Sequence, residues 1–123
     1  MAKKKIQEEI DPVVQSVIEG IQELKGKSIV TIDLRNVKNT ICDFFIICEG
    51  DSNTHVASIA DSVERFVYLK NSEKPRHVEG RENAHWVLID FFNVVVHVFQ
   101  KEYRDFYKLE DLWSDGKMEQ IQD

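Results

Sequence analysis

The chain has 123 residues and a formal net charge of -6, with 42% hydrophobic and 31% charged residues, which fits one folded domain rather than two. The acidic balance argues against direct binding to duplex nucleic acid, which needs an excess of Lys and Arg on one face. The apolar runs are far shorter than the roughly 20 residues that span a bilayer, so we expect a cytoplasmic protein without membrane contact.

The first predicted element is a helix over about residues 11–25. Asp11 followed by Pro12 is typical of a helix start, because the Asp side chain accepts bonds from free amides and proline suits the first helical position. Apolar residues then recur at helical spacing, and Gly26 is the predicted stop. Residues 1–10 include three lysines but no apolar run typical of a signal peptide, and we expect a flexible N-terminus there.

Two strands, a second helix and a third strand follow in the middle of the chain. Alternating β-branched residues over 28–34 predict a strand, and the continuous apolar run at 44–48 predicts a central strand that is covered on both faces. Helical spacing predicts a helix over about 53–69, capped by one of the residues at its start. The segment 76–80 is predicted to be a short edge strand.

Residues 86–91 and 94–99 carry the strongest strand patterns and are predicted to pair as a hairpin. Only Phe92 and Asn93 separate them. Asn tolerates the positive φ of such a turn more readily than Phe does, so we expect either that Asn93 adopts it or that the loop is longer than two residues.

Helical spacing returns over residues 101–113, which are predicted to form the last helix. Residues 114–123 contain few apolar side chains and are predicted to fray. Two helices between strands, followed by a hairpin, indicate one α/β domain over residues 11–113. Its sheet is expected to be mixed, with about five strands, and flanked by helices.

One segment invites an enzymatic interpretation, because Gly50, Asp51 and Ser52 lie where a strand leads into a helix. Nucleotidyltransferases bind phosphate with a turn at this position, and they also place two carboxylates one residue apart on a following strand to hold magnesium. Here Asp90 stands without such a neighbour. The favoured interpretation is a turn and a helix cap. The alternative is an active nucleotidyltransferase or phosphohydrolase that uses the Gly50–Ser52 turn and Asp90.

The histidines and cysteines do not form a recognisable metal or nucleophile motif. The four histidines lack the helical i, i+4 spacing of zinc sites, and His97 lies in a Val-rich strand, where a hydrogen-bonded structural role is favoured. Cys42 and Cys48 match neither a redox pair nor a zinc knuckle, so we expect inert core thiols in a reduced compartment. We predict no metal and no cofactor.

The last third of the chain is rich in aromatic residues with charged residues between them. Trp, Tyr, Phe and Arg are enriched at interface hot spots, although the same side chains also fill cores. We therefore predict that this region binds a partner. The predicted partner-binding residues are Trp86, Asp90, Phe91, Phe92, Arg104, Phe106, Tyr107, Glu110 and Trp113.

Several motifs, in their order along the chain, resemble the ribosomal silencing factor (Iojap-like) family over about residues 13–115. One departure is the hairpin turn, where Phe92-Asn93 replaces the Gly-Asp usual in the family. The motifs that carry the resemblance are Ile32–Leu34, Asp43–Ile47, Glu49–Ser52, Glu79–Gly80, Trp86–Asp90, Val95–Phe99 and Arg104–Trp113.

The resemblance implies a nucleotidyltransferase-like fold without the catalytic carboxylate pair, and therefore a protein that is not an enzyme. It further implies binding to the large ribosomal subunit, through that subunit's fourteenth protein at the intersubunit face. Such binding would block association with the small subunit and repress translation when nutrients are limiting. A role in large-subunit maturation and a possible homodimer are also implied. An acidic chain suits a basic ribosomal protein, because complementary charge speeds encounter and fixes orientation.

Overall fold

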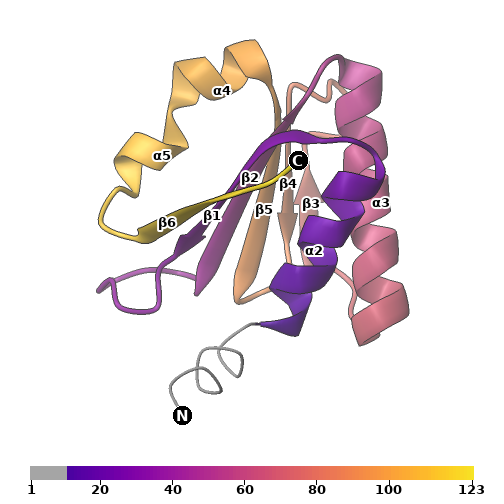
Figure 1. Ribbon diagram of the computed structural model, residues 1–123. Helices are drawn as coiled ribbons and strands as arrows, with labels where there is room; N and C mark the ends of the chain where they lie inside the picture. The colour runs from indigo at the N-terminus through magenta and orange to yellow at the C-terminus, as the bar shows by residue number, and fades with distance from the viewer. Residues whose placement is uncertain (1–10) are drawn as a thin grey trace.

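A mixed sheet of six strands forms the centre of the computed structural model, which describes residues 11–123 (Figure 1). The strands lie in the order β3-β4-β5-β2-β1-β6, and β2 and β5 run parallel while the other neighbours are antiparallel. The predicted hairpin is confirmed as β4–β5, and the predicted edge strand as β3. The strands are β1 (Lys27–Asp33), β2 (Phe44–Gly50), β3 (His77–Glu79), β4 (Trp86–Asp90), β5 (Val94–Gln100) and β6 (Lys117–Ile121).

Helices lie on both faces of the sheet. One face is covered by α2 (Pro12–Glu23) and α3 (Asn53–Asn71), and the other by α4 (Lys101–Tyr107) and α5 (Leu109–Leu112) (Figure 1). The predicted cap of α2 is confirmed, because the Asp11 carboxylate accepts bonds from the first amides of the helix. Within residues 11–123, every helix is too short or too polar to span a lipid bilayer.

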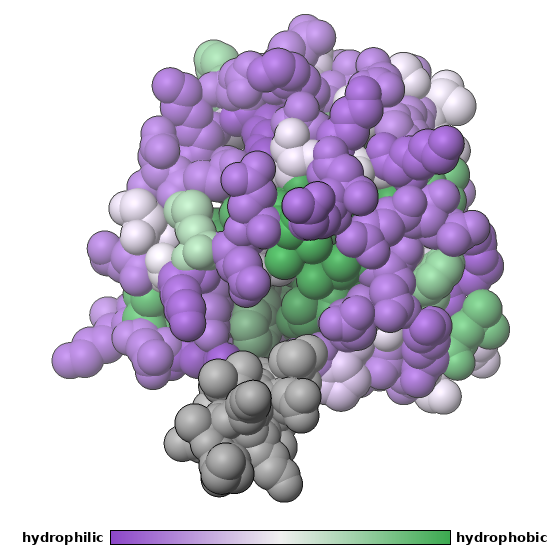
Figure 2. Space-filling model, viewed as in Figure 1, coloured by the Kyte–Doolittle hydropathy of each residue, from purple (hydrophilic) through white to green (hydrophobic). Residues whose placement is uncertain are grey.

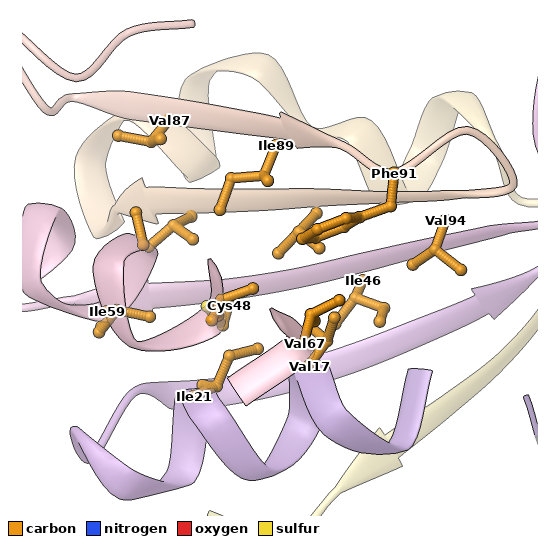
Figure 3. Close-up of a cluster of buried hydrophobic side chains, with 14 of the residues drawn as sticks. Val17, Ile21, Ile46, Cys48, Ile59, Val67, Val87, Ile89, Phe91 and Val94 are labelled. Carbon is orange, nitrogen blue, oxygen red and sulfur yellow. The ribbon is translucent and has the colours of Figure 1, made fainter. Parts of the chain in front are cut away.

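The main core lies between the sheet and the pair α2 and α3 (Figure 3). β2 is buried on both faces, as predicted for a central strand, because Ile46 and Cys48 face this core while Phe45 and Ile47 face the second one. The second core lies under α4 and α5. Its side chains include Leu34, Phe45, Ile47, Phe99, Leu109 and Trp113.

α2 ends at Glu23, two residues before the predicted end at about residue 25. Lys25, not Gly26, adopts the left-handed conformation, with φ of 58°. The Lys25 amide bonds to the Gln22 carbonyl and the Gly26 amide to the Ile21 carbonyl, which is the Schellman arrangement of a helix end. Gly26 is needed for space instead, since a Cβ there would lie 2.4 Å from Ile21 Cγ2.

The residues after 113, which were predicted to fray, form an ordered edge strand. β6 pairs with β1 in antiparallel register from Ile29–Ile121 to Asp33–Lys117. Its faces are largely exposed, so its few apolar residues gave no strand signal, and backbone pairing holds it in place. The sheet therefore has six strands instead of about five, and the domain extends beyond residue 113.

The single helix predicted over residues 101–113 is two short helices. Lys108 is left-handed, with φ of 46°, and its amide bonds to the Arg104 carbonyl, which ends α4. α5 then starts in a new direction. The change of direction lets Leu109 and Trp113 pack against the second core.

The hairpin turn places the positive φ on Phe92, at 78°, so the expectation that Asn93 adopts it is wrong. Positive φ at only the first central residue is the sign pattern of a type II′ turn. The Phe92 amide donates to the Asp90 carboxylate at 2.8 Å, and the Arg76 guanidinium lies 4.2 Å from the Phe92 ring centre. The Asn93 carbonyl accepts hydrogen bonds from the backbone amides of Asp43 and Phe44, and these bonds fix the position of Asn93.

Candidate functional site

Trp86 begins β4 on the sheet face that α4 and α5 cover, and its half-buried indole has three close neighbours. The ring lies 4.9 Å from Phe99 and 4.7 Å from Tyr107, measured between ring centres. Its Nε1 donates a hydrogen bond to His97 Nδ1 at 3.1 Å. We call Trp86, His97, Phe99 and Tyr107 the Trp86 cluster.

His97 is the buried member of the Trp86 cluster. Phe45 meets its ring edge-on at 4.8 Å, and burial lowers the pKa of His97 to about 4, so the imidazole is neutral near pH 7. Because Nδ1 accepts the Trp86 bond, the proton resides on Nε2, for which no partner is found among the described residues. His97 is hydrogen-bonded, as predicted.

Beside the Trp86 cluster, α4 and α5 expose apolar side chains. Phe106 is 77% exposed, Tyr107 47% and Leu112 71%. Phe106 packs edge-on against Tyr107 at 5.1 Å, and Leu88 is half-buried on β4, two residues from Trp86 on the same face. We call Trp86, Leu88, Phe106 and Tyr107 the aromatic face.

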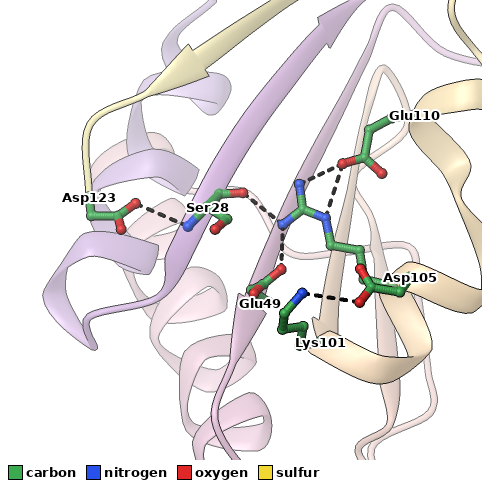
Figure 4. Close-up of polar contacts among 7 residues, drawn as sticks. Ser28, Glu49, Lys101, Asp105, Glu110 and Asp123 are labelled. Atoms are coloured by element: carbon green, nitrogen blue, oxygen red, sulfur yellow. Dashed lines mark hydrogen bonds and ion pairs between the residues drawn. The ribbon is translucent and has the colours of Figure 1, made fainter.

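Arg104 connects α4 to the sheet and to α5. Figure 4 shows its partners Ser28, Glu49 and Glu110. Its Nη1 donates to Glu49 Oε1 at 3.0 Å and to the Ser28 carbonyl at 2.8 Å, while Nε and Nη2 both donate to Glu110 Oε2. The guanidinium is buried, so Arg104 does not lie on the surface, where it was predicted to contact a partner. It positions α4, which carries Phe106 and Tyr107 of the aromatic face, and Glu110 of α5 is turned toward it.

The remaining predicted residues lie in other places. Phe91 is fully buried in the main core, so its predicted role as a partner contact is wrong. Trp113 is partly buried and meets Phe45 edge-on at 5.4 Å. Asp90 forms an ion pair with Arg76 at the end of β4 opposite Trp86, beside the exposed Phe92. The predicted set therefore does not form one surface.

The residues of the enzymatic alternative also lie apart. Gly50 pairs with Gln100 at the end of β5, whereas Asp90 pairs with Val95 near its start, and these two β5 residues are roughly 17 Å apart at the rise of a strand. Ser52 caps α3 by accepting the His55 amide, as the favoured interpretation predicted. No group of three metal-ligating side chains is found among residues 11–123.

Both cysteines are free and buried, as expected of core thiols. Burial raises the pKa of Cys42 to about 11 and that of Cys48 to about 12. Little thiolate is therefore present near pH 7, and the thiol groups are poor nucleophiles there.

The whole arrangement matches a known family. The family model described as "Ribosomal silencing factor during starvation" matches residues 7–123. The chain belongs to this family. A ribosomal silencing factor of Halalkalibacterium halodurans is 38% identical over 104 residues, which cover 85% of this chain and 87% of that protein.

Solved structures agree with the sequence match. A crystal structure of a Chromobacterium violaceum protein superposes with a TM-score of 0.79 and 32% identity, over 85% of this chain and 88% of the other. A mouse protein named for mitochondrial assembly of the ribosomal large subunit is 33% identical over 85 residues, which cover 64% of this chain and 37% of that protein. The family's named role is regulatory.

Two residues that shape the candidate site, Leu88 and Glu49, were not among the predicted partner-binding residues. Leu88 has the same strand parity as Trp86, and this alternation was the available signal for placing both on one face. Glu49 follows the apolar run of β2, and only the three-dimensional fold brings it to Arg104.

Proposed function

We propose that this chain is a ribosomal silencing factor that binds the large ribosomal subunit and blocks association with the small one. Translation would thereby be repressed when nutrients are limiting. The observation that carries the proposal is the family match over residues 7–123, with a shared fold at 32% identity. The role is binding without catalysis, which is consistent with the separation of Gly50 from Asp90.

The aromatic face is the proposed docking surface. Aromatic side chains that are rigid and partly exposed are frequent binding anchors, and Tyr107 is held by Trp86 and Phe106. Exposed carboxylates of Glu102 and Asp111 lie on the same two helices, and the carboxylate of Asp105 pairs with Lys101. A basic protein at the intersubunit face, the large subunit's fourteenth protein, is the proposed partner, because it would complement these charges.

The proposal is tested by measuring binding to purified large subunits and the joining of subunits on sucrose gradients. Tyr107→Ala should weaken binding about thirtyfold, since truncating an anchor costs about 2 kcal/mol. Tyr68→Ala is the matched control, because Tyr68 is 51% exposed on α3, on the opposite side of the sheet. Leu112→Ala and Leu69→Ala, at 71% exposure each, form a second matched pair that tests whether the docking surface extends onto α5. Equal effects of Tyr107→Ala and Tyr68→Ala would place the docking surface elsewhere.

A maturation role is the second candidate, favoured by the name of the mouse relative. It predicts binding to immature large subunits and unchanged joining of mature ones. Saturating protein that binds large subunits yet leaves joining intact would support this role over silencing.

A further inference from the structure

His97 is a polar residue in an apolar part of the sheet. It is 4% exposed, and the rings of Phe45 and Phe99 lie 4.8 and 6.3 Å from its own, measured between ring centres. Its two neighbours along β5 are valines. An apolar side chain would fill this place without a polar group to satisfy, so the packing of the core does not explain why the residue is a histidine.

The cost of the polar group appears at its second nitrogen. Nε2 carries the proton, because Nδ1 accepts a bond, and Nε2 has no hydrogen-bond partner among residues 11–123. A buried N–H without a partner costs free energy. Over the same residues, the bond from the Trp86 indole is the only hydrogen bond that the His97 ring makes. What the imidazole contributes to the structure is therefore an acceptor for Trp86.

Trp86 connects this buried bond to the surface. It lies on the same sheet face as His97, because it pairs across the strands with Phe99, two residues further along β5. The bond fixes the edge of the indole that carries Nε1, and the indole packs against Tyr107. Tyr107 in turn meets Phe106 edge-on. A buried nitrogen is thus linked, through Trp86, to the exposed residues of the aromatic face.

Exposed apolar area by itself does not distinguish the aromatic face. Figure 2 shows apolar surface between α2 and β6 as well, on the sheet face opposite α4 and α5. The side chains of α2 there include Val14 and Ile18, which are aliphatic, so no hydrogen bond orients them. Side chains that are held in place before binding lose less conformational freedom on binding. The hydrogen bond from the core is therefore the feature that sets the aromatic face apart.

We propose, on the basis of the proposed docking function, that His97 is a positioning residue, which holds the Trp86 indole in the orientation that the partner on the large subunit binds. Because His97 is buried, it acts through Trp86 and not by contact with the partner. A released indole can turn its N–H to solvent, since the ring is only half-buried. If the released ring spends about one-tenth of the time in the binding orientation, the affinity falls about tenfold.

Three variants separate positioning from packing. His97→Leu removes the acceptor together with the unpaired N–H, so it should weaken large-subunit binding about tenfold. Its urea midpoint should stay at or above that of the natural chain. His97→Gln keeps an acceptor oxygen for the indole and should bind nearly as tightly as the natural chain. The control is Val95→Ala, on the same strand and face, which should lower the urea midpoint by leaving a cavity and leave binding unchanged.

A double-mutant cycle tests whether His97 acts through the indole. Trp86→Phe keeps an aromatic ring and removes the N–H, so adding His97→Leu to it should cause no further loss of affinity. In the isolated protein, NMR follows exchange of the indole N–H of Trp86 with solvent. His97→Leu should remove the protection of this group against exchange, and His97→Gln should retain it.

Two results would overturn the positioning role. One is equal affinity of the natural chain and His97→Leu, and the other is the same loss from His97→Leu with and without the Trp86 N–H. A natural chain that does not bind large subunits would be a different failure, because it would overturn the proposed function itself and the docking role of His97 with it.

Discussion

The pairing of Trp86 with His97 makes one residue of the candidate site sensitive to acid. The indole donates to Nδ1, so a protonated imidazole would present a proton where the bond requires a lone pair. Burial opposes protonation as well and lowers the pKa of His97 from 6.5 to about 4. The Trp86 hydrogen bond and the burial therefore both favour the neutral form of His97 in the folded protein.

We therefore predict that acid destabilises the fold through His97. Between pH 6.5 and 4 the unfolded chain binds a proton that the folded chain excludes, so this contribution is complete above about pH 6.5 and lost toward pH 4. The loss should approach about 3 kcal/mol. Urea unfolding at several pH values measures it.

His97→Gln is the control for this prediction, because the Gln amide oxygen can accept the Trp86 bond but does not titrate. The variant should lose less stability than the natural chain on acidification. Parallel pH curves for the two proteins would assign the acid sensitivity to other groups.

Lys25 offers a second test on a single residue. Its left-handed backbone is strained by the Cβ, and its side chain is exposed at the end of α2. Lys25→Gly should raise the free energy of unfolding by about 1 kcal/mol, because Gly adopts this conformation without a penalty. Lys25→Ala keeps the Cβ and should bring no such gain, and thermal melts distinguish the two.

Among the elements, α4 and α5 depend most on a single side chain. Arg104 bonds to β1, β2 and α5 from a buried position, so its partners Glu49 and Glu110 are partly buried as well. Removing one member of a buried ion pair leaves uncompensated charge. Loss of Arg104 should therefore displace α4, which carries Phe106 and Tyr107 of the aromatic face.

Arg104→Ala is expected to lower the free energy of unfolding by about 3 kcal/mol and to weaken large-subunit binding through displaced helices. The control is Lys101→Ala on the same helix, whose ion pair with Asp105 is fully exposed, and no measurable change is expected there. Urea unfolding and subunit binding are measured together. Similar stability losses in both variants would contradict the structural role of Arg104.

Most elements could be predicted because their signals are local. The Asp11 cap and the apolar run of β2 each lie within a few residues of what they determine. β6 could not be predicted, because an exposed edge strand is held by backbone bonds to a strand distant in sequence. The left-handed Lys108 gave no signal either, since Lys rarely adopts that conformation.

Part of the candidate site could be predicted from residue type. Trp86 and Tyr107 were chosen by residue type, and the structure brings them together. Residue type alone could not separate them from Phe91, which has the opposite strand parity and is buried in the main core. Arg104 was chosen as a contact, and only the fold reveals its buried partners.

At the scale of the whole molecule, the net charge of -6 governs how the protein meets its partner. Long-range attraction between opposite charges acts before contact and is screened by salt within about 10 Å at 0.1 M ionic strength. The proposed partner is basic. The charge should therefore affect association more than dissociation.

We predict that raising the salt concentration slows association with large subunits and changes the dissociation rate much less. Stopped-flow or biosensor kinetics at several ionic strengths measures both rates. An association rate that does not depend on salt would argue against a basic partner. The mass from sedimentation equilibrium, measured on the same samples, tests the homodimer that the family resemblance implies.

The pairing of β6 with β1 has a consequence for the order of folding. The β4–β5 hairpin joins neighbouring segments, whereas β6 must find a strand from the other end of the domain. Closing so large a loop costs more chain entropy, so the hairpin should form early and the β1–β6 ladder late. Until then the edge of β1 is open, and an unpaired edge can recruit a strand from another chain. Dilute refolding conditions should therefore give the highest yield of native protein.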